Sequence, residues 1–232
     1  MKKIVVSFIT FVLGFSVFAE GFFSGLSNNI GVGVSMPVEK FKVEDVETIG
    51  SVGVALNAMY LGICDNGFTL KGDLFGGAVF TDDLADGTTP GGFFAFDVGA
   101  GHSFIRNEKF TLSVTGLIGM DVTSFKFDVD PYPYVDANGA DDLTANDTYT
   151  VSTVNMNVGA DVTGIYHIKP NFGLYADISL RLLPLGKSYV ELERNWEHSD
   201  GSSAGGPFTP KKYKTATGIV FFVPTIGVVW TL

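Results

Sequence analysis

The chain has 232 residues with 25 acidic and 15 basic side chains, so its formal net charge is −10. That acidity disfavours nucleic acid as a partner, because phosphate contacts need lysine and arginine. Charged residues make up 17% of the chain, below the roughly 25% of ordinary soluble domains. The single cysteine, Cys64, excludes an intramolecular disulfide.

The first 19 residues have the pattern of a secretory signal peptide. Two lysines precede an apolar run from Ile4 to Phe18, and Ala19 supplies a small residue at the cleavage point. The run is shorter than the roughly 20 residues of a spanning helix, which makes a retained anchor helix the weaker alternative. We therefore predict an exported chain with a signal peptide at 1–19 and one domain at 20–232.

Apolar residues alternate with small or polar residues along the rest of the chain, which is the pattern of β-strands with one apolar face. A strand that crosses an outer membrane needs about 9–11 residues with this two-residue period. The alternation predicts eight strands, at Ile30–Met36, Ser51–Leu61, Phe68–Thr81, Phe94–Phe104, Phe110–Thr123, Val154–Tyr166, Phe172–Leu182 and Val220–Leu232.

Short and long connections take turns between these strands. The second, fourth and sixth strands are followed by tight turns, of which Asp65-Asn66-Gly67 is a strong hairpin signal because Asn and Gly tolerate positive φ. The first, third, fifth and seventh strands are followed by long segments that we expect to be loops: Val38–Gly50, Asp82–Gly92, Asp128–Thr148 and Pro184–Ala216. Short periplasmic turns and long outer loops are typical of membrane barrels. The predicted fold is all-β, an eight-stranded antiparallel up-and-down transmembrane β-barrel.

Aromatic residues gather at the predicted strand ends. Each tight turn is followed at once by phenylalanine, at Phe68, Phe110 and Phe172. We expect an aromatic belt at the periplasmic interface from Tyr60, Phe104, Tyr166 and Trp230, and a second belt at the outer interface from Phe80, Phe94, Phe127 and Tyr149. Aromatic residues also favour strands in general, but that preference does not explain their position at the ends.

A soluble eight-stranded barrel of the lipocalin kind would also alternate, with its apolar face inside and Lys and Glu outside. Here the more polar face consists mainly of Gly, Ser, Thr, Asn and Asp, which suit a narrow interior, and the apolar face is nearly free of charge. The sequence therefore favours a membrane barrel over a soluble one.

The strand plan and the ending Ile226–Leu232 resemble those of the small eight-stranded outer-membrane barrels, of the OmpX, OmpW and OmpA transmembrane-domain type. The resemblance implies that outer-membrane lipid surrounds the chain and that the last strand is a recognition signal for the barrel-insertion machinery. The chain departs from the type in ending with leucine rather than phenylalanine. Pro224 is a second departure, which predicts a bulge and a shift of phase near it.

Seven ionisable residues fall on the face predicted to point inward: Lys71, Asp73, Asp97, Asp121, Asp161, Asp177 and Arg181. The favoured interpretation is a buried polar network that fills the barrel, because eight strands leave room only for packed side chains. The alternative is a narrow channel that prefers cations.

Catalysis is not expected from this sequence. Some small outer-membrane barrels modify lipid with a histidine, but His102, His167 and His198 have no evident partner on a rigid strand. The acid-rich segment 128–147 does not match a calcium-loop pattern. We predict no cofactor, no metal site and no enzyme, and an outer-membrane role in surface interaction or envelope integrity, with an extracellular ligand at the long loops as a possible partner.

Overall fold

The computed structural model describes residues 25–42, 48–81, 89–128, 132–134, 143–198 and 218–232. Among these residues, no helix is both long and apolar enough to cross a membrane. The strands are β1 (Ser27–Ser35), β2 (Val38–Lys42), β3 (Thr48–Ile63), β4 (Phe68–Thr81), β5 (Thr89–Arg106), β6 (Phe110–Asp128), β7 (Tyr132–Tyr134), β8 (Leu143–Lys169), β9 (Phe172–His198) and β10 (Gly218–Thr231).

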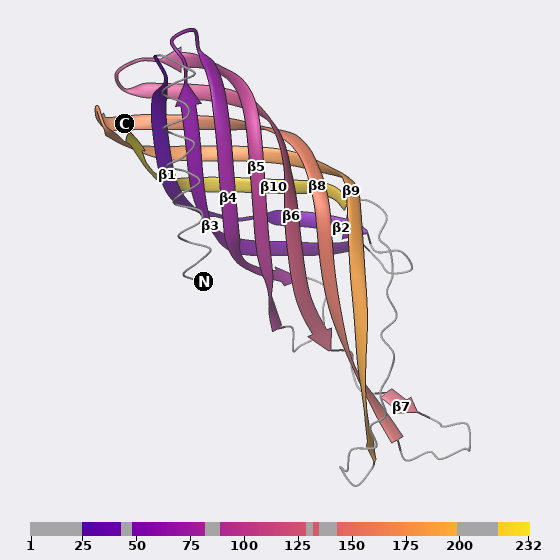
Figure 1. Cartoon of the computed structure of the whole chain (residues 1–232). Coiled ribbons are helices and arrows are strands. Elements are labelled where there is room, and N and C mark those ends of the chain that lie inside the picture. Colours follow the sequence, from indigo (N-terminus) through magenta and orange to yellow (C-terminus); the bar gives the residue numbers. More distant parts are fainter. Residues whose placement is uncertain (1–24, 43–47, 82–88, 129–131, 135–142, 199–217) are drawn as a thin grey trace.

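The strands form one closed antiparallel barrel, shown in Figure 1. Neighbours in sequence pair around the wall from β3 to β10, and β1 closes the ring by pairing with both β10 and β3. The short β2 continues the wall position of β1, because it also pairs with β10 and β3. Among the described residues, the short β7 pairs only with the start of β8. The barrel therefore has eight wall positions, and the predicted fold class is confirmed.

Pro37 interrupts the first wall position without changing its register. Ser35 pairs with Thr225 in β10, and Val38 pairs with Phe222, so the two ladders share one register. Backbone bonds hold the break between them, since Met36 donates to the Pro224 carbonyl at 3.0 Å. Proline lacks an N–H donor and is tolerated in a ladder where neighbouring groups bridge it.

The three tight turns lie where the alternation predicted them. In the first, Gly67 has φ +87°, a conformation that favours glycine, and its N–H donates to the Cys64 carbonyl at 2.9 Å. The side chain of Asn66 accepts a bond from the N–H of Phe68 at 2.9 Å. We call this end of the barrel the turn end. The opposite end, where the long connections leave, is the loop end.

Several segments expected to be loops are partly strand. Residues 38–42 form β2, residues 89–92 belong to β5, and residues 132–134 form β7. The largest error concerns the segment Pro184–Ala216, because β9 continues through Pro184 to His198. These strands continue past the apolar stretch that suits a lipid face. Strand residues that face solvent need not alternate with apolar residues, so the alternation in the sequence does not predict these parts of the strands.

The bulge predicted at Pro224 is absent. The register between β10 and β9 is continuous from Phe221 to Trp230, and the irregularity in β10 lies instead between Gly218 and Val220. Phe221 and Val223 both point inward and are fully buried. The phase does not shift near Pro224, because the lumen itself accepts apolar side chains at this level.

The outer surface of the barrel is apolar. Leu56, Ile118, Ile178 and Ile226 are each more than half exposed, while the residues beside them in sequence point inward and are mostly buried. The exposed aromatic side chains include Phe68, Phe80, Phe94, Phe104, Tyr166 and Trp230. Tyr60 is instead buried and donates to Asn28, and the side chains of Phe127 and Tyr149 lie outside the described part of the chain. An apolar exterior of this size is what lipid contact requires.

Candidate functional site: the polar lumen

All seven predicted inward residues are buried in the barrel interior. Their exposed fractions are between 0% and 4%. They come from five strands: β4 carries Lys71 and Asp73, β9 carries Asp177 and Arg181, and β5, β6 and β8 contribute one aspartate each. Strand alternation brings them together, because every second residue of each strand points into the same narrow space.

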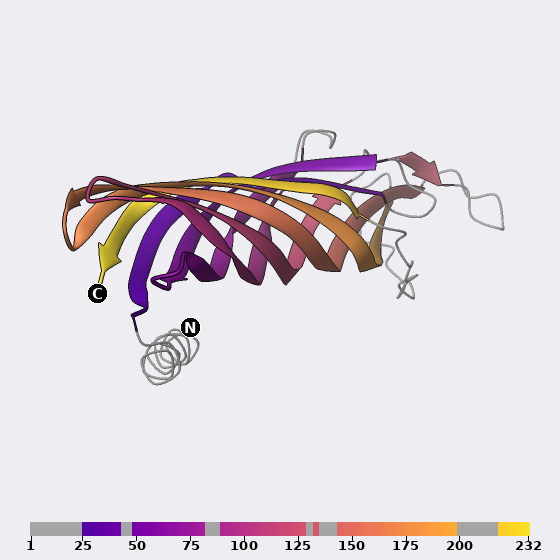
Figure 2. The same ribbon diagram turned by 90° about the horizontal axis from the view of Figure 1, so that it is seen from above.

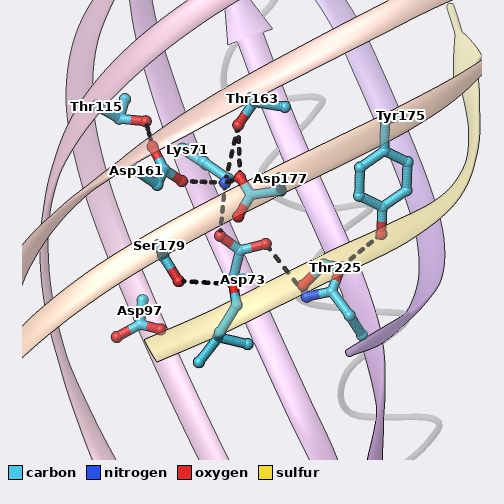
Figure 3. A network of polar contacts seen from close by, with 12 residues as sticks. Lys71, Asp73, Asp97, Thr115, Asp161, Thr163, Tyr175, Asp177, Ser179 and Thr225 are labelled. Carbon is cyan, nitrogen blue, oxygen red and sulfur yellow. Dashed lines mark hydrogen bonds and ion pairs between the residues drawn. The ribbon is translucent and has the colours of Figure 1, made fainter. Parts of the chain in front are cut away.

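Lys71 is the centre of this network, as Figure 3 shows. Its ammonium contacts the carboxylates of Asp161 and Asp177, and lies 3.1 Å from an oxygen of Asp73. It also donates to the hydroxyl of Thr163 at 3.0 Å. One cation therefore joins strands β4, β8 and β9 across the lumen, which ties distant parts of the wall together.

Hydroxyl and amide groups add further hydrogen bonds to the carboxylates of this centre. Thr115 donates to Asp161, and Thr163 donates to Asp177 at 2.7 Å. On the other side, Asn57 donates to Asp73 at 3.3 Å and accepts a bond from the hydroxyl of Tyr175 at 2.6 Å. Buried charges are tolerated when they are paired and hydrogen-bonded in this way.

Arg181 forms a second charged group toward the loop end. Its guanidinium lies 2.8 Å from Asp97 and is stacked between two aromatic rings, with Phe75 and Phe221 each 5.0 Å away at the ring centroid. Cation–π contact and the ion pair offset part of the loss of water around this buried cation, whose Nε and Nη1 have no hydrogen-bond partner among the described residues. Asp97 is also the direct cross-strand neighbour of Asp73, so the two charged groups adjoin.

Asp121 lies apart from both cations. It shares a hydrogen-bond donor, Asn155, with Glu39, a buried residue that the sequence analysis missed. Asn155 donates to Asp121 at 2.7 Å and to Glu39 at 3.2 Å, and Thr123 donates to Glu39 at 3.0 Å. Glu39 was assigned to a loop because Pro37 ends the visible alternation. Counting the two-residue period through Pro37 would have placed Glu39 on the inner face, next to Ser35 and Pro37.

Two apolar clusters lie on either side of the central network. On β9, for example, Tyr175 belongs to the cluster at the turn end, Asp177 and Arg181 are polar, and Leu183 belongs to the cluster at the loop end. The loop-end cluster contains Ala55, Phe75, Val79, Phe93, Ala95, Leu183, Phe221 and Val223. The turn-end cluster contains Met59, Leu61, Ile63, Ile165, Tyr175 and Val229. The sequence analysis did not predict this layering, because it treated the inner face as polar throughout.

The histidines and the cysteine do not join the network within the described side chains. His167 bonds to the hydroxyl of Thr111 at 3.0 Å near the turn end, and His102 points outward beside Phe104. The side chain of His198 is outside the described part of the chain. Cys64 is half-buried next to the first tight turn, where Arg106 donates to its carbonyl at 2.8 Å. These contacts fix turns and strand ends.

No protein-family model matches the sequence, and a search of curated proteins gives no match. Solved structures of similar fold include Ail, the attachment invasion locus protein of Yersinia pestis, with 14% identity, a TM-score of 0.45 and coverage of 89% of this chain and 98% of that one. The outer membrane protein OprG from Pseudomonas aeruginosa has 10% identity, a TM-score of 0.47 and coverage of 90% and 97%. The outer membrane protease OmpT from Escherichia coli has 11% identity, a TM-score of 0.43 and coverage of 90% and 97%.

These proteins have different roles, and the likeness at such identities concerns the fold alone. The architecture of this chain follows from its own geometry, since the wall is closed, the exterior is apolar and the interior holds a compact polar network. The chain is a closed, eight-stranded antiparallel β-barrel with an apolar outer surface.

Proposed function

We propose that the chain is a non-catalytic outer-membrane barrel that acts through the part of its sheet held beyond the bilayer, in surface interaction or envelope integrity. The signal peptide at 1–19 would direct export, and the last strand would engage the barrel-insertion machinery. Outer-membrane lipid is then its permanent surrounding.

The observation that carries this proposal is the filled lumen. A water-filled path would leave its lining partly exposed, yet the charged residues along the centre are at most 4% exposed. The two apolar clusters add layers that an ion would have to cross without water. This packing weighs against the alternative of a narrow cation-preferring channel.

The long strands support a role outside the membrane. β8 and β9 each contain 27 residues, and their pairing continues to Leu143 and His198. At about 3.3 Å per residue each strand measures about 90 Å, whereas crossing a bilayer takes about 9–11 residues. Figures 1 and 2 show the two strands running past the barrel at the end opposite the C-terminus, where β7 joins them. We call residues 143–153 of β8 and 188–198 of β9 the extension.

Planar-bilayer recordings test the proposal directly. The refolded chain should give no steady conductance above the lipid background, and liposomes that contain it should not swell in small sugars or amino acids. The double variant Phe75→Ala and Phe221→Ala is the matched comparison, because it removes two large side chains from the loop-end cluster. A stable conductance in the unmodified chain, with cation selectivity that Asp73→Ala changes, would overturn the proposal in favour of the channel.

A further inference from the structure

A row of outward-facing hydroxyl groups crosses β6, β8 and β9 where the extension begins, and Figure 1 shows these strands side by side. Ser124 of β6 pairs with Ser152 of β8, which pairs in turn with Tyr189 of β9. The hydroxyls of the two serines are 2.9 Å apart, and Tyr189 is 42% exposed. The residues that follow the serines, Phe125 and Thr153, are buried in the lumen. Direct cross-strand neighbours point to the same side of a sheet, so the three side chains form one row on the outer wall, which we call the hydroxyl row.

Two exposed lysines lie at opposite corners of the hydroxyl row. Lys126 of β6 is one outward step farther from the turn end than the row, and Lys187 of β9 is one outward step nearer to it. On the strand between them, Lys126 is opposite Thr150 and Lys187 is opposite Val154. Their backbones are therefore about 13 Å apart along the strands and about 10 Å apart across them. The long, flexible side chain of each lysine can bring its ammonium over the hydroxyl row from its own side.

The charges of these two lysines are not matched by carboxylates of the protein. Among the described residues, neither lysine has a carboxylate within ion-pairing distance, whereas Lys71 and Arg181 in the lumen do. Glu191 also faces outward here, but it lies two strands away from Lys126, on the far side of Thr150. Two ammonium groups therefore accompany one carboxylate on this part of the wall, in a chain whose formal net charge is −10.

The hydroxyl row marks the boundary between the apolar and the polar part of the outer wall. Two outward steps toward the turn end, Met120, Met156 and Leu185 form an apolar row whose side chains are 47%, 57% and 64% exposed. One step in the other direction, the outward side chains are all polar: Lys126, Thr150 and Glu191. Lysine and tyrosine are favoured where a bilayer meets water, because their stems or rings are apolar and their tips are polar.

We propose that the hydroxyl row and its two lysines bind the phosphate headgroup of a lipid in the leaflet at the loop end. The inference rests on the proposed function, because it requires the apolar wall to lie in a bilayer. The phosphate would accept hydrogen bonds from the row and balance the ammonium charges, and the acyl chains would lie on Met120, Met156 and Leu185. Charge-assisted bonds to phosphate are strong, and cationic side chains at a membrane surface attract anionic lipids. A lipid held here would fix the base of the extension at the membrane surface.

Native mass spectrometry of the refolded chain in detergent tests the site, with short-chain phosphatidic acid as the probe and phosphatidylcholine of the same chain length as the comparison. One phosphatidic acid should be retained more tightly than phosphatidylcholine. The double variant Lys126→Gln and Lys187→Gln should weaken the binding of phosphatidic acid about tenfold or more, because both cations at the surface are lost. Ser152→Ala and Tyr189→Phe should each weaken it about fivefold, the usual effect of one lost hydrogen bond. The binding of phosphatidylcholine should not change in any variant.

Exposed lysines at the turn end provide the matched control. Lys109→Gln with Lys169→Gln makes the same change in net charge, and this variant should bind phosphatidic acid as the unmodified chain does. An equal loss of binding in the two double variants would show a general attraction of charges and overturn the proposal. Unchanged binding after the loss of Lys126 and Lys187 would overturn it as well.

Inorganic phosphate decides whether the ligand is a lipid. It has no acyl chains to lie on the apolar wall, so an excess of it should not displace phosphatidic acid, and displacement would indicate a site for soluble anions and overturn the proposal. The outcome is distinguishable from that of the proposed function. A chain that seals vesicles without preferring phosphatidic acid would overturn only the lipid site, whereas steady conductance with the preference intact would overturn only the proposed function.

Discussion

Lys71 shows how one side chain can determine the interior of this barrel. Its ammonium is the only group within ion-pairing distance of Asp161 and Asp177 in the described part of the chain. Three carboxylates surround it. Each of them depends on the charge of this one lysine, whereas the lysine does not depend on any single aspartate. Removing one acid leaves two partners, whereas removing the lysine leaves three buried charges without compensation.

We therefore expect Lys71→Met to destabilise the barrel strongly. Breaking a buried ion pair by removing one partner costs about 3–5 kcal/mol, and three carboxylates lose their partner here. Urea unfolding in lipid vesicles would measure the free energy of unfolding. Lys109→Met, on an exposed lysine of the second tight turn, should change it by no more than about 0.5 kcal/mol. Equal stability of the two variants would show that the network does not depend on the lysine.

Gly119 makes room for one of the network carboxylates. A Cβ at this position would collide with the side chain of Asp97 and with the carbonyl of Phe96. On the same strand, a Cβ at Gly116 would lie 3.9 Å from its nearest neighbour, the carbonyl of Ala100. Gly119 faces the lumen, whereas Gly116 faces outward.

Gly119→Ala should lower the free energy of unfolding by about 1–3 kcal/mol, the usual effect of forcing an extra group into a packed interior. Gly116→Ala should stay within about 0.5 kcal/mol of the unmodified chain. Parallel urea titrations of both variants would measure the difference. A larger loss in Gly116→Ala would mean that contacts on the outer face, rather than space in the lumen, set the need for glycine.

At the residue scale the sequence predicts which face of the wall a side chain occupies better than it predicts which residues that side chain contacts. Alternation alone placed Lys71, Asp177 and Arg181 inside, because parity fixes the face of a strand residue. It could not predict that Arg181 lies between Phe75 and Phe221, since that contact depends on the stagger of strands far apart in sequence. Glu39 was missed for a local reason, the proline two residues before it.

Among the elements, β8 and β9 matter most for the proposed function, because together they form the extension. They remain paired from the third tight turn to Leu143 and His198, with irregularities at Met156–Val158 and at His167–Lys169. Within the described residues, β10 pairs with β9 only up to Arg181, so the outer part of β9 has β8 as its strand neighbour. On its other side β8 pairs with β6 as far as Thr148 and with β7 from Leu143 to Ala145, so the extension is a β8–β9 ladder flanked by these two strands.

The extension should be separable from the barrel. Deleting residues 144–147 together with 194–197 removes four consecutive rungs, because each residue of the first segment pairs with one of the second. None of the lumen residues is touched, so we expect the folded band and its unfolding temperature to stay nearly unchanged. Surface binding by intact cells should fall if the proposed role is right. Loss of the folded band would show instead that the extension helps the barrel to form.

The strand plan was predictable from sequence where strands face lipid, and the extension was not. A lipid-facing strand must keep charge off its outer face, as Phe68–Thr81 does, and both of its predicted ends are correct. Past the bilayer the constraint disappears, which is why the segment after Leu182 gave no strand signal. Pro224 misled the prediction in the other direction, because its backbone faces the break between β1 and β2, where Met36 donates to its carbonyl.

For the whole molecule, closure is the property to test first. A closed barrel resists sodium dodecyl sulfate until it is heated, so an unboiled sample should migrate faster than a boiled one, and far-ultraviolet circular dichroism should show strand structure. We expect this in detergent without any added ligand. A single band that does not respond to heat, or a chain that stays soluble without detergent, would contradict a membrane barrel.

The continuous ladder of β8 and β9 also has a mechanical consequence. A force applied at Leu143 and His198 would travel along two strands that meet again at the third tight turn, at the other end of the barrel. Such a pull loads the bonds to β6 and β10 in shear, so that many of them share the tension at once. A load at the tip of the extension would thus be spread along the full length of the barrel.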